Sequence, residues 1–230
     1  MLSYESSSLL SAVSFVRHGF FLRPSLGNSP IDRSMALASL HIDSKLFTVR
    51  QVHGNQVIAV NMQSEPDRIS SVEADALITA DYRLALAISY ADCVPILLRA
   101  SDDSVIAAIH AGWRGLLNGV ICNTLTKIKQ EFGPKNLSAA IGPAISVDSF
   151  CLAGDGLLGF LKSWPQHVKY LAADSYVDLS AVAYSQLSAG GVMQIEKVGG
   201  YTDKDSHKYF SHRRDQGQTG RQIAIISLNR

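Results

Sequence analysis

The chain has 230 residues, and its 47% apolar and 18% charged content supports one sizeable hydrophobic core and excludes an intrinsically disordered protein. A net charge of +1 without an extended Lys or Arg run argues against nucleic acid and anionic membranes as partners. Three widely spaced cysteines form a poor disulfide framework, and the sequence shows neither a convincing signal peptide nor an apolar run long enough for a bilayer, so we expect a cytoplasmic protein.

The first predicted elements are a loop, a helix and a pair of strands. Residues 20–34 are rich in Pro, Ser, Gly and Asn and predict a loop, and apolar residues at helical spacing predict a helix over 33–42. Residues 46–60 indicate two short strands joined by a tight turn at His53-Gly54-Asn55. Gly-Asn supplies the positive φ that such a turn needs.

The rest of the chain mixes strands with two helices. One helix is expected over 116–132, and another begins after Asp178 as N-cap and stops at Gly190. Strands are predicted over residues 74–80, 84–98, 104–111, 137–145, 193–200 and 221–229. Adjacent strand pairs among irregularly placed helices favour a mixed-sheet, layered α/β fold over a doubly wound parallel one, and no linker divides residues 1–230.

Three soft metal ligands stand where predicted strands end or turn. His53 lies in the turn of "RQVHGNQV", His110 ends the strand of "SVIAAIHA", and Cys93 stands beside an Asp and near Pro95, which predicts a sheet edge or a bulge. Zinc prefers imidazole and thiolate, with copper as the main rival, and three protein ligands leave a fourth position open for catalysis. Packing or a satisfied hydrogen bond is the alternative for each residue taken alone.

A glycine-rich turn, "GWRGLLNG", follows His110 and leads into a predicted helix. Its free N–H groups and the helix dipole suit an oxyanion or phosphate, and the Arg114 guanidinium adds a bidentate donor. In the alternative, Gly112 and Gly115 only permit a tight strand-to-helix turn, and Trp113 fills the core. A neighbouring metal site favours the anion-binding interpretation.

Six segments carry a resemblance: "RQVHGNQV", "EADALIT", "ADCVPILL", "HAGWRG", "AAIGPAI" and "YFSHRRDQGQTGRQIAII", in this order. They resemble the laccase-domain family, whose members are described as multicopper polyphenol oxidoreductases and as purine nucleoside phosphorylases. The resemblance implies a single α/β domain of layered α-β-β-α type, similar to Cys-His hydrolases. It also implies phosphorolysis of adenosine, inosine and methylthioadenosine, adenosine deamination as a further activity, and a zinc ion held by His53, Cys93 and His110.

The resemblance and the residue chemistry together give roles to further side chains. Cys93, His110 and Asp92 are the expected catalytic residues, with Asp92 as a proton carrier or as a group that orients a metal ligand. Capping of backbone amides is the alternative for Asp92. Arg114 and the amides after Gly112 are expected to bind phosphate.

Other residues are expected around the substrate. Gln51 shares a face with His53 if its strand alternates, so Gln51 is expected to contact substrate. The loop of residues 22–34 is shorter than in typical family members. Arg23 and Asn28 are expected to occupy positions equivalent to those in the family, and Arg23 is expected to bind substrate.

The last of the six segments, "YFSHRRDQGQTGRQIAII", matches the closing motif of the family. We expect it to close the pocket or to hold the Gly112 loop. The alternative is a solvated basic turn before the last strand. Arg213 is expected to bind substrate or phosphate from this motif. The residues of the motif to which this expectation applies are Phe210, His212, Arg213 and Arg221.

Three departures from the family pattern limit what carries over. The segment before "YFSHRR" lacks a cysteine pair, and "IGPAI" lacks the Cys often found after its Pro, so a second metal site is not expected. No His-x-His motif is present, although a multicopper oxidase needs several. The ligand count therefore does not support the laccase name.

Three alternatives to the nucleoside enzyme stay open. A cysteine hydrolase, such as an amidase that edits peptidoglycan precursors, would use Cys93 as nucleophile and His110 as base, with His53 as orienter or bystander. A laccase-like polyphenol oxidase would use copper. A metal-binding partner protein would have no catalytic activity. The expected partners are purine nucleosides and phosphate, and the protein is expected to be a monomer or a homodimer.

Overall fold

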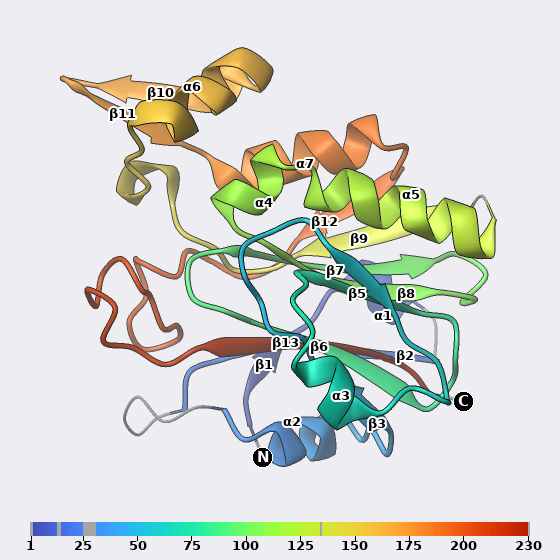
Figure 1. Ribbon diagram of the computed structural model, residues 1–230. Helices are drawn as coiled ribbons and strands as arrows, with labels where there is room; N and C mark the ends of the chain where they lie inside the picture. The colour runs from blue at the N-terminus through green and yellow to red at the C-terminus, as the bar shows by residue number, and fades with distance from the viewer. Residues whose placement is uncertain (1, 13–14, 25–30, 134, 230) are drawn as a thin grey trace.

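The computed structural model describes residues 2–12, 15–24, 31–133 and 135–229, within which two mixed β-sheets stack face to face (Figure 1). The five-stranded sheet consists, in spatial order, of β1 (Tyr4–Glu5), β2 (Val16–Phe21), β13 (Gln222–Leu228), β6 (Leu84–Tyr90) and β3 (Lys45–Phe47). The six-stranded sheet consists of β12 (Gln194–Lys197), β9 (Leu137–Ile141), β7 (Val94–Ala100), β8 (Ile106–Ala111), β5 (Ala76–Thr79) and β4 (Val57–Ala59). Both combine parallel and antiparallel pairs.

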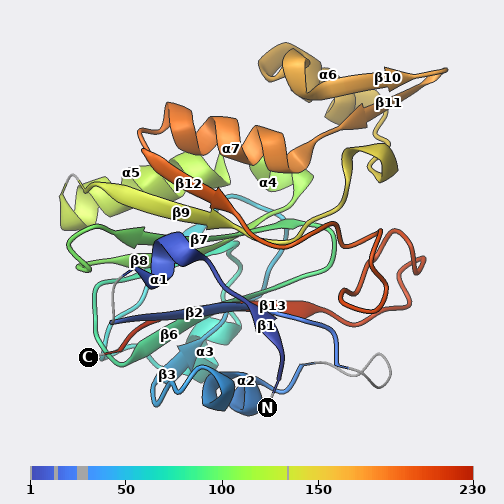
Figure 2. The same ribbon diagram turned by 180° about the vertical axis from the view of Figure 1, so that it is seen from behind.

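Helices cover the outer face of each sheet, as the two opposite views show (Figures 1 and 2). The six-stranded sheet carries α4 (Trp113–Leu117), α5 (Val120–Phe132) and α7 (Leu179–Ala189), and the five-stranded sheet carries α2 (Arg33–Ser39). An arm beyond α4 holds α6 (Gly154–Ser163) and the ribbon of β10 (Val168–Leu171) and β11 (Asp174–Val177). The remaining short elements are α1 (Ser8–Ser11), α3 (Pro66–Ser70) and the 3₁₀ turns Val147–Ser149 and Pro165–His167.

The buried core follows the same layers. Leu97 of β7 and Leu86 of β6 belong to the cluster between the two sheets. Ile121 of α5 and Val182 of α7 pack on the outer face of the six-stranded sheet, and Ala36 of α2 packs beneath the five-stranded one. The predicted layered α-β-β-α class is therefore confirmed.

Several local predictions are wrong. Residues 46–60 do not form a hairpin, because β3 and β4 lie in different sheets and each pairs in parallel with a later strand. The positive φ in the connection belongs to His53, at 60°, rather than to Gly54. The helix expected over 116–132 is split into α4 and α5, because Gly119 takes a left-handed φ of 81° that ends the first turns.

The edge position predicted from Pro95 is also wrong. β7 is an inner strand between β9 and β8. Pro95 is its second residue, and pairing with β9 begins only at Ile96, so the ring stands where the ladder on that side starts. The loop expected from residue 20 begins later, because Phe20 and Phe21 belong to β2.

The capping prediction for α7 is confirmed. The Asp178 carboxylate accepts a hydrogen bond from the Ala181 amide at 2.9 Å, and Gly190 directly follows the last helical residue. Asn28 of the shortened loop lies outside the described residues.

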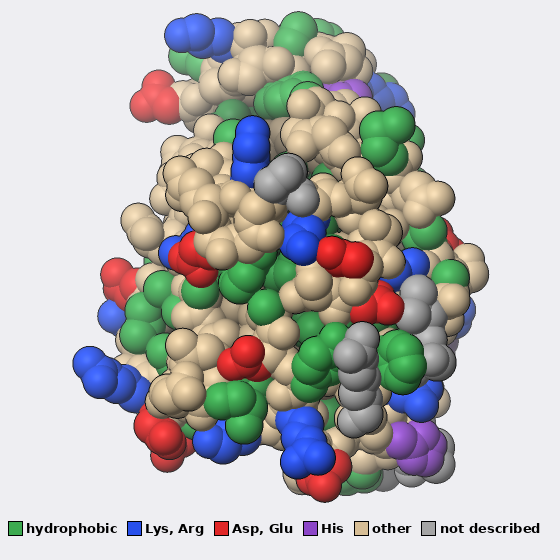
Figure 3. Space-filling model, turned by 90° about the vertical axis from the view of Figure 1, so that its right-hand side faces the viewer, with side chains coloured by type: hydrophobic (Ala, Val, Ile, Leu, Met, Phe, Trp, Pro, Cys, Tyr) green, Lys and Arg blue, Asp and Glu red, His purple; other side chains and the backbone are tan. Residues whose placement is uncertain are grey.

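The surface and the helices agree with the bulk composition. Acidic and basic side chains are scattered among one another on the face shown in Figure 3, in keeping with the small net charge. No helix of the described ranges combines the length and the apolar character that crossing a membrane requires.

Candidate functional site

A cavity of about 610 Å³ opens where β6 ends, β7 begins and β8 ends. Both sheets and α4 contribute to its walls, together with residues 198–221 between β12 and β13, which we call the closing segment. The described residues that line it are Val49, Gln51, His53, Ser89, Tyr90, Ala91, Asp92, Cys93, His110, Trp113, Arg114, Ile145, Phe150, Leu179, His212, Arg213 and Arg221. Its size lies within the range of about 300–1,000 Å³ that is usual for small-molecule sites.

The strand register brings Cys93 and His110 together. β7 and β5 both run antiparallel to β8, so the residues at their starts lie beside the end of β8. His110 is opposite Pro95 in one ladder, and Cys93 directly precedes β7. Residues 17 positions apart thus meet at one corner of the sheet.

His53 reaches the same corner from the connection between β3 and β4. Its ring lies edge-on to that of His110, with 4.9 Å between centroids and an interplanar angle of 79°. The ligand atoms of His53, Cys93 and His110 all lie within 4.8 Å of one another, which makes this a cluster able to hold one ion. His53 is exposed and His110 is buried, so the cluster spans the cavity wall from rim to core.

Asp75, which the sequence reasoning did not single out, lies behind the cluster. Its carboxylate is fully buried and lies 2.7 Å from Nδ1 of His110. It also accepts hydrogen bonds from the amides of Val52, His53 and Gly54, at 3.2, 3.0 and 2.6 Å. The available signal was an acidic residue next to a buried strand in "EADALIT".

Two glycines make room for the cluster. A Cβ on Gly112 would lie 2.8 Å from Cδ2 of His53 and 3.2 Å from Sγ of Cys93. A Cβ on Gly115 would lie 2.8 Å from the carbonyl oxygen of Gly54. Both positions therefore require glycine, because the loop that carries His53 comes too close for a side chain. The helix that follows Gly112 is five residues long.

The cluster is electrostatically coupled. Burial opposes the thiolate of Cys93, but the two imidazoles outweigh it and lower the pKa of that thiol. Burial likewise opposes a charged His110, but Cys93 and Asp75 raise the pKa of its imidazole. Burial also disfavours ionised Asp75, and hydrogen bonds from His110 and the loop amides still hold its pKa below the usual value.

The donor set fits a zinc ion. Two imidazoles and a thiolate are ligands that zinc prefers, and His110 carries the carboxylate partner on its other nitrogen that metal-binding histidines usually have. The space that a side chain would fill at Gly112 is left free beside two of the ligands. His53, Cys93 and His110 are therefore the residues that would hold the ion.

Basic side chains also line the cavity. The Arg114 guanidinium lies 4.3 Å from the centroid of the Trp113 ring, and Arg213 donates to the Ser149 carbonyl at 2.9 Å. Arg221 also lines the cavity. This rim suits an anionic substrate.

Three other predicted residues have their polar groups engaged elsewhere. Gln51 lines the cavity, but its amide both donates to and accepts from the Ser89 backbone at 2.7 Å. Asp92 accepts from the Thr202 hydroxyl at 2.6 Å and from the Arg213 amide at 2.7 Å, contacts that fit the capping alternative. Arg23 donates to the Ser206 carbonyl and is not among the described residues that line the cavity.

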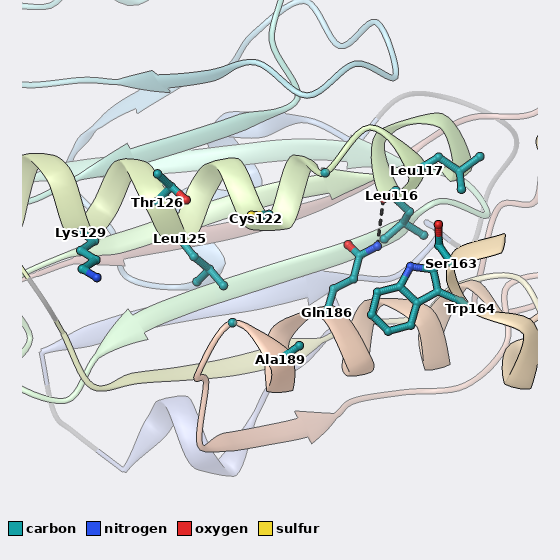
Figure 4. A pocket seen from close by; sticks show the side chains of 12 residues that line it. Leu116, Leu117, Cys122, Leu125, Thr126, Lys129, Ser163, Trp164, Gln186 and Ala189 are labelled. Atoms are coloured by element: carbon teal, nitrogen blue, oxygen red, sulfur yellow. Dashed lines mark hydrogen bonds between the residues drawn. The ribbon is translucent and has the colours of Figure 1, made fainter. Parts of the chain in front are cut away.

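A second cavity, of about 420 Å³, lies between α5 and α7 (Figure 4). The Gln186 amide crosses it and donates to the Leu116 carbonyl at 2.9 Å. The described residues that line it include Cys122 and Lys129 but no Asp, Glu or His, so they do not form a cluster of three metal ligands. The first cavity is lined by the cluster of His53, Cys93 and His110, so it is the candidate functional site.

The comparison with protein families agrees with this geometry. Residues 31–229 match the model of the family described as multi-copper polyphenol oxidoreductase laccase. The chain belongs to this family.

Curated relatives cover most of the chain. A purine nucleoside phosphorylase of Rickettsia conorii is 36% identical over 74% of this chain and 70% of its own. One of Xylella fastidiosa is 32% identical over 83% and 76%, and Escherichia coli purine nucleoside phosphorylase YfiH is 33% identical over 86% and 79%.

Solved structures share the fold. YlmD from Geobacillus stearothermophilus superposes with a TM-score of 0.83 over 94% of this chain and 93% of its own, at 24% identity. A Bacillus licheniformis hypothetical protein, YfiH, gives 0.81 over 93% of both chains, also at 24% identity. These structures support the layered α/β class.

Proposed function

We propose that this chain is a zinc-dependent purine nucleoside phosphorylase that acts on adenosine, inosine and methylthioadenosine, with adenosine deamination as a further activity. The observation that carries the proposal is the meeting of His53, Cys93 and His110 at the wall of a nucleoside-sized cavity. The names of the relatives support it, because those that are 32–36% identical are purine nucleoside phosphorylases.

In phosphorolysis, a phosphate oxygen bonds to C1′ of the ribose while the bond from C1′ to the purine nitrogen breaks. The purine leaves with the bonding electrons, and the proton given up by phosphate ends on the purine. Arg114 and Arg213 are the residues that we expect to bind the phosphate, because both line the cavity and a guanidinium is a strong phosphate donor. Ile145, Phe150 and Leu179 supply apolar lining for the base.

Deamination makes a different demand on the site. A zinc ion held by the three ligands would make a water nucleophilic at neutral pH. The chain's own residues would bind the same nucleoside and hold His110 through Asp75. The backbone amides after Gly112 stay predicted phosphate-binding groups beside Arg114.

We also propose that the chain acts as a single-domain cytoplasmic enzyme. Its three cysteines are all unpaired, which supports a reducing compartment. Nucleosides and phosphate are the proposed partners, and size-exclusion chromatography distinguishes a monomer from a homodimer.

The deciding experiment incubates the purified protein with adenosine, with and without phosphate, and resolves adenine, inosine and hypoxanthine. Adenine that forms only with phosphate identifies phosphorolysis, and inosine that forms without phosphate identifies deamination. Zinc bound without turnover of any nucleoside would leave a non-catalytic metal-binding protein as the better description.

A cysteine hydrolase is the second candidate, favoured by one observation. Cys93, His110 and Asp75 stand in the order nucleophile, base and orienting carboxylate, with Asp75 in the place predicted for His53. A metal-free protein whose Cys93 is alkylated rapidly, and protected by substrate, would favour this candidate.

The laccase-like oxidase has less support. Within the described residues, one cluster of at least three candidate ligands is present, whereas a multicopper enzyme needs several. Metal analysis that returned copper in place of zinc would revive it.

A further inference from the structure

Asp75 joins two parts of the site that are far apart in the sequence. Its carboxylate accepts from the amides of Val52, His53 and Gly54 and from Nδ1 of His110. Two carboxylate oxygens offer about four acceptor positions, and four donors occupy them here. The group has no exposed surface, so water does not replace a lost partner.

The contact with His110 decides which ring nitrogen is free. A nitrogen that binds a metal must carry no proton, and a neutral imidazole has one proton to place. With Asp75 as an acceptor at 2.7 Å, that proton belongs on Nδ1. Nε2 is then left as the ligand atom beside Cys93.

The contacts with the loop decide where the second imidazole lies. His53 has a φ of 60°, a left-handed conformation that is uncommon for residues other than glycine. Three successive amides around it converge on the same carboxylate. The carboxylate therefore holds the backbone turn that presents His53 to the cluster.

We propose that Asp75 is a positioning residue that presets both histidines of the cluster at once, by fixing the proton of His110 on Nδ1 and by holding the turn that carries His53. The inference rests on the metal centre proposed above. It predicts that one buried carboxylate controls metal affinity through two ligands without touching the metal.

The isosteric substitution Asp75→Asn separates the two roles. If the new NH₂ group faces His110, Nδ1 must become an acceptor and the proton moves to Nε2, where it blocks the metal. If the NH₂ group faces the amides of Val52 and Gly54, the loop loses its acceptor and His53 is released. Both orientations weaken the site, because every partner of this carboxylate is a donor.

The experiment compares Asp75→Asn with Glu73→Gln, a neutralisation two residues away at an exposed carboxylate that pairs with Arg50. Zinc affinity is measured by competition with a chelator, and ¹H–¹⁵N spectra of the zinc-loaded protein locate the proton of His110. We expect zinc to bind roughly 10–100-fold more weakly to Asp75→Asn and unchanged to Glu73→Gln. In the wild type, the proton should be found on Nδ1.

Two results would overturn the inference. One is an Asp75→Asn protein whose zinc affinity stays within about twofold of the wild type, well short of the loss of roughly 10–100-fold that is expected for a residue orienting a metal ligand. The other is a wild-type His110 that carries its proton on Nε2, and this measurement decides the question even if the variant does not fold. A wild type that binds zinc but turns over no nucleoside would refute the proposed function and leave this inference intact.

Discussion

Two buried histidines, one in each sheet, have opposite electrostatic environments. His18 in β2 and His110 in β8 are 4% and 3% exposed. Burial lowers the pKa of His18 to about 4, and its Nε2 accepts a hydrogen bond from the Ser7 amide. The pKa of His110 is raised, because the Cys93 thiolate and the Asp75 carboxylate stabilise a charged ring and outweigh its burial. Burial alone keeps a histidine neutral and structural, whereas the partners make His110 a candidate for chemistry.

The largest effect should come from removing the partnered histidine. We expect His110→Ala to reduce bound zinc from near-stoichiometric to about a tenth or less, and phosphorolysis to fall by roughly a thousandfold, because a zinc site with two protein ligands binds weakly. Inductively coupled plasma mass spectrometry and product analysis measure the two quantities. His18→Gln is the matched control, because it changes a histidine that is equally buried. Equal zinc in both variants would break the comparison.

Acid should destabilise the protein through His18. Because its folded pKa of about 4 is below the ordinary 6.5, the folded state resists a proton that the unfolded chain takes up. Stability from this group is complete above about pH 6.5 and is lost as the pH falls toward 4, by about 3 kcal/mol.

Urea unfolding of the wild type and of His18→Gln at several pH values measures this contribution. Carboxylates also titrate in this window, so the difference between the two proteins is the relevant quantity. Parallel stability curves from pH 7 to 4 would show that His18 contributes nothing.

The three candidate ligands could be predicted from the sequence, but the buried carboxylate that holds them could not. His53, Cys93 and His110 are residue types that stand out at strand ends, and the resemblance grouped them. Asp75 escaped, because its link to His110 depends on the register in which Ala76 faces Ile109. That pairing spans more than thirty residues, and no local pattern specifies it.

The wrongly predicted hairpin has the same origin. The alternation in residues 46–60 identifies strands, but it does not say which sheet each strand joins. The capping of α7 by Asp178 could be predicted, because donor and acceptor are three residues apart. Arg23 and Gln51 could not be placed, because their partners, Ser206 and Ser89, are distant in the sequence.

Arg114 extends the comparison of the two buried histidines to an exposed charged side chain at the rim of the cavity. Arg114 is exposed and stacks on Trp113, so its removal should leave the cluster intact. We expect Arg114→Ala to raise the KM for phosphate about 10–100-fold with zinc content unchanged, the effect of losing a charge-assisted hydrogen bond. Initial rates at varied phosphate measure it, with Arg68→Ala on α3 as control. An unchanged KM would remove Arg114 from the phosphate site.

The smallest effect is expected at Asp92, another buried carboxylate of the cavity. Asp92 holds the closing segment through Thr202 and Arg213, and it contacts neither imidazole in the described hydrogen bonds. Asn tolerates the left-handed φ of 85° at this position, so Asp92→Asn tests the carboxylate without straining the backbone. One lost acceptor predicts about 1 kcal/mol lower stability and a few-fold higher nucleoside KM.

Zinc content separates the two carboxylates. Asp92→Asn should keep its zinc, because its partners are a hydroxyl and a backbone amide rather than a metal ligand. Chelator competition alongside Asp75→Asn makes the comparison direct. If both variants lost affinity alike, the closing segment and the cluster would form one cooperative unit, and the contacts of each carboxylate would no longer explain its role.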